Sequence, residues 1–177
     1  WLARCLVCIA LCFAVFGARA STMDAEIPVL RTPGLQAITG LNSRELVIQR
    51  AAEDAIERGD FQRAEQHWET LLARLEKRLG ANVAAVWSTR FNLAVLAHRE
   101  NRYQQALAQY RDLIEHIEAS GNFRHPAMAA PLFGMGAVLQ ALNQHALAVD
   151  SMQRAIFITR TDKGLNSLEQ TQYDNNL

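Results

Sequence analysis

Histidines are the residues of this chain best suited to metal binding or acid–base chemistry. The five are His67, His98, His116, His125 and His145. No two of them stand four residues apart, the spacing that places two imidazoles on one face of a helix to hold a metal. Asp112 and His116 are one helical turn apart and could share a ligand, although such a pair is more often a solvated ion pair. The spacing therefore predicts no metal site.

Other groupings that would indicate catalysis or charge-driven binding are missing as well. The run Gly134-Met135-Gly136 lacks the third glycine of a dinucleotide-binding loop, and the chain has no Gly-x-Ser-x-Gly nucleophile elbow. The 18 basic residues balance 18 acidic ones, which removes the electrostatic basis for binding nucleic acid or an anionic membrane surface. We therefore expect no enzyme within these residues, no small-molecule cofactor and no nucleic-acid partner.

Residues 1–20 have the layout of a secretory signal peptide. Arg4 precedes an unbroken apolar run from Cys5 to Gly17 that contains all three cysteines, and small residues follow at Ala18 and Ala20. A membrane span needs about 20 apolar residues, so we expect cleavage before Ser21; an uncleaved anchor is the alternative, and would be the one membrane attachment. The mature chain, residues 21–177, would contain no thiol. With no Asn-x-Ser/Thr acceptor either, the sequence favours a bacterial periplasm or secretion.

Beyond Asn42 the sequence repeats with a period of about 42 residues. Three turns mark it: Gly59-Asp60-Phe61, Asn101-Arg102-Tyr103 and Asn143-Gln144-His145. A small residue comes seven positions before each turn, a second follows the turn, and a large side chain comes four positions later. These columns are Ala52, Ala94 and Gly136; Ala64, Ala106 and Ala148; and Trp68, Tyr110 and Met152. Small residues are favoured where two helices approach closely, which predicts a repeated helix–helix contact.

Apolar residues recur every three or four positions around these turns, which predicts helices rather than strands. We expect helix pairs at 43–58 with 61–79, 83–99 with 103–119, and 127–141 with 145–161, with Pro131 kinking or delaying the fifth helix. The expected fold class is all-α: an α-solenoid of antiparallel helix pairs, with about three full repeats and the first helix of a fourth. Its units are about 45–86, 87–128, 129–170 and a partial 171–177. Residues 21–42 have no helical period and read as a flexible linker, with Pro28, Pro33, Gly34 and Gly40.

Together the turns, the small residues and the large side chains resemble the tetratricopeptide repeat family over residues 43–177. The period is longer than the usual length of about 34 residues and is similar to that of a subgroup with extended helices. The third unit departs from the pattern at His145 and Met152. The resemblance implies a superhelix whose concave groove, lined by the first helix of each unit, binds a protein or an extended peptide.

Residues about 100° around each first helix from its packing stripe are expected to line this groove. Phe91 and Phe133 stand one period apart there, although they could instead pack between neighbouring helices. The resemblance implies that Asn92 hydrogen-bonds the backbone of a bound peptide. The sequence departs from the carboxylate-clamp version of the family, because Phe91 or Phe133 takes the position of its lysine, so we expect no clamp of that type. The full set of groove candidates is Ser88, Phe91, Asn92, Val95, Arg99, Phe133, Gln140 and Asn176.

These observations predict an exported scaffold or adaptor that binds proteins or peptides through its groove. The alternative is the N-terminal repeat arm of a larger envelope enzyme, receptor or transporter component whose catalytic domain lies beyond Leu177. Residues 167–177 have the pattern of a first helix without its partner. Because such a helix cannot bury its apolar face alone, we also expect that the chain could self-associate through it. A terminal cap is the other interpretation of that helix.

Overall fold

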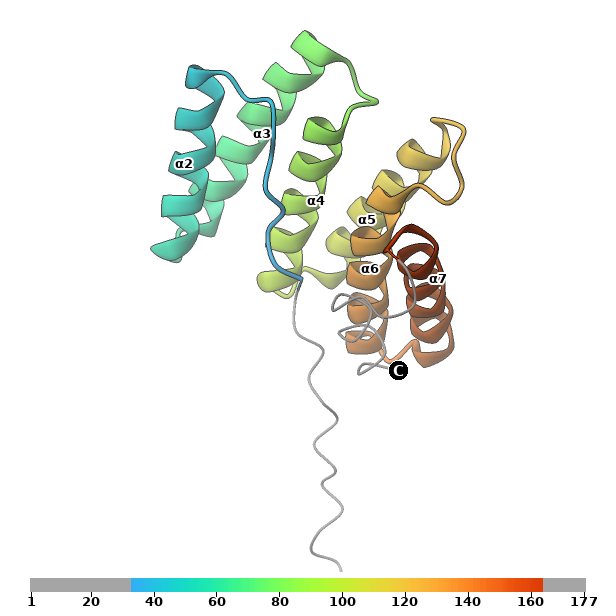
Figure 1. Cartoon of the computed structure of the whole chain (residues 1–177). Helices are drawn as coiled ribbons and strands as arrows, with labels where there is room; N and C mark the ends of the chain where they lie inside the picture. Colours follow the sequence, from blue (N-terminus) through green and yellow to red (C-terminus); the bar gives the residue numbers. More distant parts are fainter. Residues whose placement is uncertain (1–32, 164–177) are drawn as a thin grey trace, which may run out of the picture.

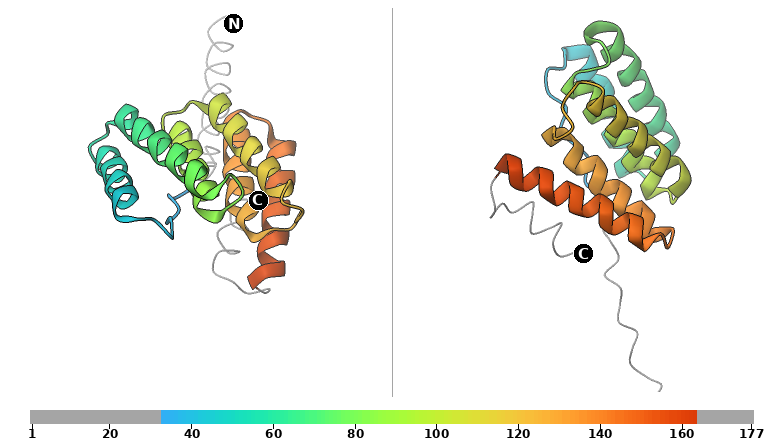
Figure 2. Two further views of the ribbon diagram at one scale, coloured as in Figure 1. Left: turned by 90° about the horizontal axis from the view of Figure 1, so that it is seen from above. Right: turned by 90° about the vertical axis from the view of Figure 1, so that its right-hand side faces the viewer.

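The computed structural model describes residues 33–163, and they form a stack of helix pairs (Figure 1). The helices are α2 (Ser43–Glu57), α3 (Phe61–Leu79), α4 (Ala84–Arg99), α5 (Tyr103–Glu118), the 3-10 turn η1 (Pro126–Met128), α6 (Ala129–Ala141) and α7 (His145–Lys163). Each helix contacts the next along the chain, and the described residues contain no strand. The expected all-α solenoid of antiparallel helix pairs is confirmed, and Figure 2 shows the stack from above and from the side. The predicted fourth unit lies outside the described residues.

The helix boundaries follow the sequence closely, with one informative difference at the start of α6. The predicted helix 61–79 is found as Phe61–Leu79, whereas the helix expected from residue 127 begins at Ala129, after η1. Pro131 has no N–H to donate to the carbonyl of residue 127, so an α-helical turn cannot close there. The chain instead forms a 3-10 turn in which the Met128 N–H donates to the His125 carbonyl at 3.0 Å. Pro131 therefore delays the helix.

The three predicted turns are equivalent at the level of single hydrogen bonds. Gly59, Asn101 and Asn143 all adopt positive φ, at 74°, 59° and 59°. At the first turn the Gly59 N–H donates to the Ile56 carbonyl at 3.0 Å and the Asp60 N–H to the Ala55 carbonyl at 2.8 Å. The other two turns repeat both bonds in the same register. Each first helix thus ends in a Schellman motif, which explains why only Gly or Asn occupies the left-handed position.

The columns of small residues mark the closest helix contacts. Ala52, Ala94, Ala64 and Ala106 are fully buried, as are the rings of Trp68 and Tyr110 beside them. In the third unit a Cβ on Gly136 would lie 2.8 Å from Cγ of Met152 and 3.2 Å from the carbonyl oxygen of Ala148. Glycine is therefore required for α6 and α7 to approach this closely, and the column is a packing feature.

Ion pairs join successive units across the outer surface. Arg102, at the turn before α5, donates to both carboxylate oxygens of Glu65 on α3, at 3.0 and 3.1 Å. Arg154 on α7 pairs with Glu118 at the end of α5. Because a bidentate arginine fixes direction as well as distance, the contact between Arg102 and Glu65 helps to set how the second unit sits on the first.

Candidate ligand groove

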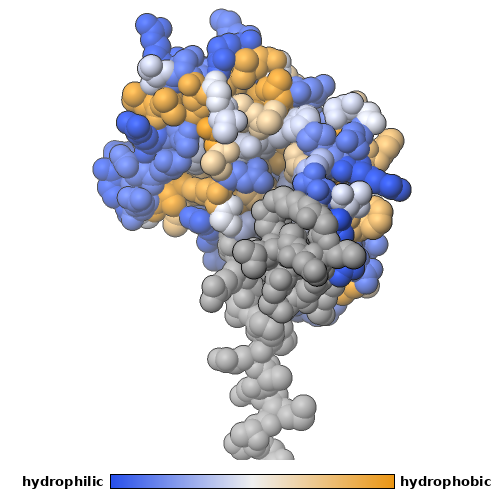
Figure 3. Space-filling model, in the orientation of Figure 1, coloured by the Kyte–Doolittle hydropathy of each residue, from blue (hydrophilic) through white to orange (hydrophobic). Residues whose placement is uncertain are grey.

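Residues 33–41 form an extended segment that crosses the first helices of the array; we call it the N-terminal strap. It has no regular secondary structure, and it runs beside α4 before the chain enters α2 (Figure 1). Pro33 and Ile38 are nevertheless buried, and Leu35 and Leu41 are partly buried against the helices. On the face that the strap crosses, apolar side chains lie among polar ones (Figure 3). The part of the expected linker that the structure describes is thus a packed element and not a free spacer.

Asn92 on α4 fixes the middle of the strap through both halves of its side-chain amide. Its Oδ1 accepts the backbone N–H of Gln36 at 2.8 Å, and its Nδ2 donates to the Gln36 carbonyl at 3.0 Å. The Asn92 side chain is fully buried, so neither bond is exchanged freely with water. An amide that donates and accepts at once matches a peptide unit irrespective of its side chain. This is the geometry that the family resemblance implied for Asn92, and here the chain's own backbone occupies it.

Two aliphatic side chains of the strap, those of Leu35 and Ile38, pack against the helices. Ile38, 8% exposed, belongs to the apolar cluster formed by the first unit and part of α4, whereas Leu35 packs against the cluster of the second and third units. Ala37 and Thr39 are exposed to solvent. The strap therefore bridges the two halves of the core by two aliphatic side chains and one backbone clamp.

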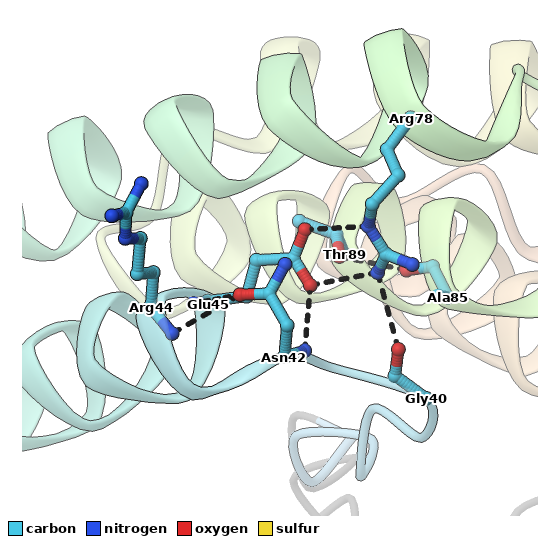
Figure 4. Close-up of polar contacts among 7 residues, drawn as sticks. All are labelled: Gly40, Asn42, Arg44, Glu45, Arg78, Ala85 and Thr89. Atoms are coloured by element: carbon cyan, nitrogen blue, oxygen red, sulfur yellow. Dashed lines mark hydrogen bonds and ion pairs between the residues drawn. The ribbon is translucent and has the colours of Figure 1, made fainter.

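A second group of polar contacts holds the end of the strap where it meets α2 (Figure 4). Arg78 on α3 donates to both oxygens of the Glu45 carboxylate, at 2.8 and 2.7 Å, and also to the Gly40 carbonyl at 3.1 Å. The Glu45 carboxylate accepts the Asn42 backbone N–H at 2.9 Å, and the Asn42 side chain in turn caps α2. This reciprocal capping box and the arginine together make Glu45, 2% exposed, a fully partnered buried charge.

The pKa of Glu45 reflects two opposing effects. Burial alone would raise the pKa, because the charged form loses its hydration. Hydrogen bonds from Arg78 and from the backbone of Asn42, with the positive charges of Arg78 and Arg74, outweigh burial and lower the pKa below its ordinary value. The carboxylate is therefore charged throughout the neutral range.

The structure brings only some of the predicted groove residues to a ligand-accessible position. Arg99 is exposed, and Ser88 and Gln140 are half-buried. Phe91, Val95 and Phe133 are instead buried members of the apolar core, and the Phe91 ring packs 5.8 Å from that of Tyr110. The expectation that the two phenylalanines offer an aromatic surface is thus corrected in favour of packing between helices. Asn176 lies outside the described residues.

The reason for this difference is that α4 is enclosed on nearly every side. It contacts α3, α5 and α6, and the strap covers a further face through Asn92. A helix packed in this way is buried over most of its surface, so a rotation of 100° from its packing stripe leads mostly to other helices and the strap rather than to solvent. The sequence did contain a signal for the anchor of the strap, because Asn42 and Glu45 have the Asn-x-x-Glu spacing of a capping box.

Two further titratable groups lie in the core. His98 on α4 contacts the Tyr103 ring edge-on at 5.9 Å, and burial lowers its pKa to about 4. Burial also raises the pKa of Tyr110. Within residues 33–163 no three His, Cys, Asp or Glu side chains gather as metal ligands would, and no helix there is long and apolar enough to cross a membrane.

Comparison with models of known protein families found no match, and comparison with curated proteins found no relative. The interpretation of the groove therefore depends on its own geometry.

Proposed function

We propose that this chain is an exported helical-repeat scaffold, similar to tetratricopeptide repeat proteins, that binds extended segments of partner proteins along α4. The observation that carries the proposal is the pair of hydrogen bonds between Asn92 and the backbone of Gln36. The contact uses no feature of the glutamine side chain, so any extended peptide could make it.

The family part of the proposal is supported by the equivalence of the three units. The regular period, the buried small-residue columns and the repeated Schellman turns are each properties expected of such an array. Export to the bacterial periplasm or beyond is supported by the pattern of residues 1–20 and by the absence of cysteine after Cys12. The groove would act in the same way if the chain were one arm of a larger envelope protein.

The proposal is tested by probing an array of immobilised ten-residue peptides with the full chain. The strap must first be displaced, so the probe carries Ile38→Asp, which puts a charge where the strap enters the core. A second probe carries Ile38→Asp with Asn92→Ala. We expect peptide binding by the first probe and a loss of about ten- to a hundredfold in the second, because one backbone N–H and one carbonyl would lose their partner.

A control probe combines Ile38→Asp with Gln104→Ala, which alters an exposed polar residue on α5, a second helix that is not among the groove candidates. It should bind like the single variant. The proposal is wrong if the Ile38→Asp chain, shown to be helical by circular dichroism, binds no peptide on the array.

A further inference from the structure

The strap is recognised by contacts that do not depend on its being part of the same chain. Asn92 binds the backbone of Gln36, while Ile38 is buried in one apolar cluster and Leu35 packs, partly buried, against the other. The intervening and following residues, Ala37 and Thr39, are exposed. The site therefore selects an aliphatic residue immediately before the clamped residue and another two positions after it. It makes no demand on the side chains at the positions of Ala37 and Thr39, which are exposed.

The two ends of the strap are attached very differently. Its C-terminal end is held by Arg78 through the Gly40 carbonyl and by the capping box that begins α2. Among the contacts within residues 33–163, its middle is held by the Asn92 side chain and by aliphatic side chains. Gly40, whose carbonyl oxygen is the first group of the C-terminal attachment, has φ 76°, a conformation that glycine adopts at no steric cost. The middle of the strap can therefore lift by rotation near Gly40 while the start of α2 stays in place.

We propose that the strap is a built-in competitor for the groove, and that the groove's partner is an extended peptide with the same pattern: an aliphatic residue, a clamped residue, any residue, and a second aliphatic residue. In this chain the pattern is Leu35-Gln36-Ala37-Ile38. This inference rests on the proposed function and adds to it the class of ligand and the means by which binding is restrained.

The size of the restraint follows from the tether. A segment joined by a short flexible linker competes at an effective concentration of about 1 mM. If a free peptide with the strap sequence bound the open groove with a Kd of some tens of micromolar, the strap would weaken its apparent binding about ten- to a hundredfold.

The test uses a fluorescent peptide with the sequence of residues 33–42 and full chains that differ only in the strap. Fluorescence anisotropy should show that Ile38→Asp binds the peptide at least about tenfold more tightly than the unaltered chain does. The matched control is Thr39→Asp, which adds the same charge at the neighbouring exposed position. It should bind like the unaltered chain, and a peptide with aspartate in place of its isoleucine should not bind Ile38→Asp.

A second measurement needs no altered protein. In the unaltered chain, excess strap peptide should speed hydrogen exchange of the Gln36 amide, since that peptide would take over the Asn92 side chain. The Leu46 amide, which donates to the Asn42 carbonyl at the start of α2, should keep its protection. Unchanged exchange at Gln36 under saturating peptide would contradict displacement.

The outcomes separate this inference from the proposed function. Binding of other peptides to Ile38→Asp, with no preference for the strap pattern and no gain over the unaltered chain, overturns the inference and leaves the function standing. Failure of the array experiment overturns both. A dimer seen by light scattering only for the unaltered chain would show that straps exchange between copies, and would overturn competition within one chain.

Discussion

The Tyr110 ring on α5 lies directly against the backbone of α6 at Gly134, where an added Cβ would be 2.6 Å from Cζ of the ring. We expect Gly134→Ala to destabilise the fold by about 1–2 kcal/mol, because the cost of overpacking exceeds the gain in helix propensity. Urea unfolding measures the change. In a double-mutant cycle with Tyr110→Leu, the cost of the alanine should fall, since the smaller side chain gives way. A Gly134→Ala chain as stable as the parent would contradict this packing.

Removing the arginine that partners Glu45 should weaken the start of the array. Arg78→Ala leaves the buried carboxylate with the Asn42 N–H as its remaining described donor. Because Arg78 itself is 37% exposed, we expect a moderate loss of about 1–3 kcal/mol in the free energy of unfolding, again from urea titration. Lys77→Ala, an exposed neighbour on α3, is the control and should change stability by less than about 0.5 kcal/mol.

The same pair predicts a pH dependence. The pKa of Glu45 is lowered in the folded state, so the unfolded chain binds the proton more readily and the stability from this group is present above pH 4.5. That stability is lost as the pH falls through the lower folded pKa. In Arg78→Ala, burial would dominate and raise the pKa, so the loss on acidification should begin at a higher pH. Midpoints of urea unfolding between pH 3 and pH 7 would reveal the difference.

His98 provides a second pH dependence with a separate window. Its pKa is about 4 in the folded chain against 6.5 for an ordinary histidine, so the unfolded state binds more protons between these values. Stability should therefore fall as the pH is lowered from 6.5 to about 4, by an amount on the order of 2 kcal/mol. His98→Gln should flatten this part of the profile, whereas His145→Gln at the exposed start of α7 should leave it unchanged. An unaltered slope in His98→Gln would show that another group is responsible.

The proposed export predicts a definite mature N-terminus. The chain expressed in a bacterium with its first residues intact should be recovered from the periplasm beginning at Ser21, as N-terminal sequencing would show. Ala20→Gln should retain a precursor that still carries residues 1–20, because the peptidase requires a small side chain at that position. The same change at Ala25, beyond the cleavage site, should leave processing intact. A cytosolic chain that keeps residues 1–20 would contradict the prediction.

The helices could be predicted because their signals are local. Phe61, Ala64 and Trp68 repeat at helical spacing, and Asn101 and Asn143 occupy the same left-handed position as Gly59. Each signal acts within one or two turns of the chain, so spacing alone locates it.

The position of the strap and the burial of the candidate groove residues depend on contacts between distant residues. Gln36 and Asn92 are 56 positions apart, and no local sequence pattern around either residue predicts that they form hydrogen bonds with each other. Pro33 and Gly34 mark the strap as irregular, but irregular backbone packs just as firmly when a side-chain amide satisfies its polar groups. Spacing left Phe91 open to either a groove position or a packed one for the same reason, since its burial depends on what covers α4 and not on its angle around the helix.

The three equivalent turns allow a whole repeat to be removed from the array. Because Gly59 and Asn101 end their helices with positive φ and the same two hydrogen bonds, deletion of residues 60–101 would join the first turn to Arg102 with little change in the backbone at the junction. The protein is thus built so that length can be gained or lost in steps of one whole repeat. The array can be lengthened or shortened in evolution, or by design, without a new fold.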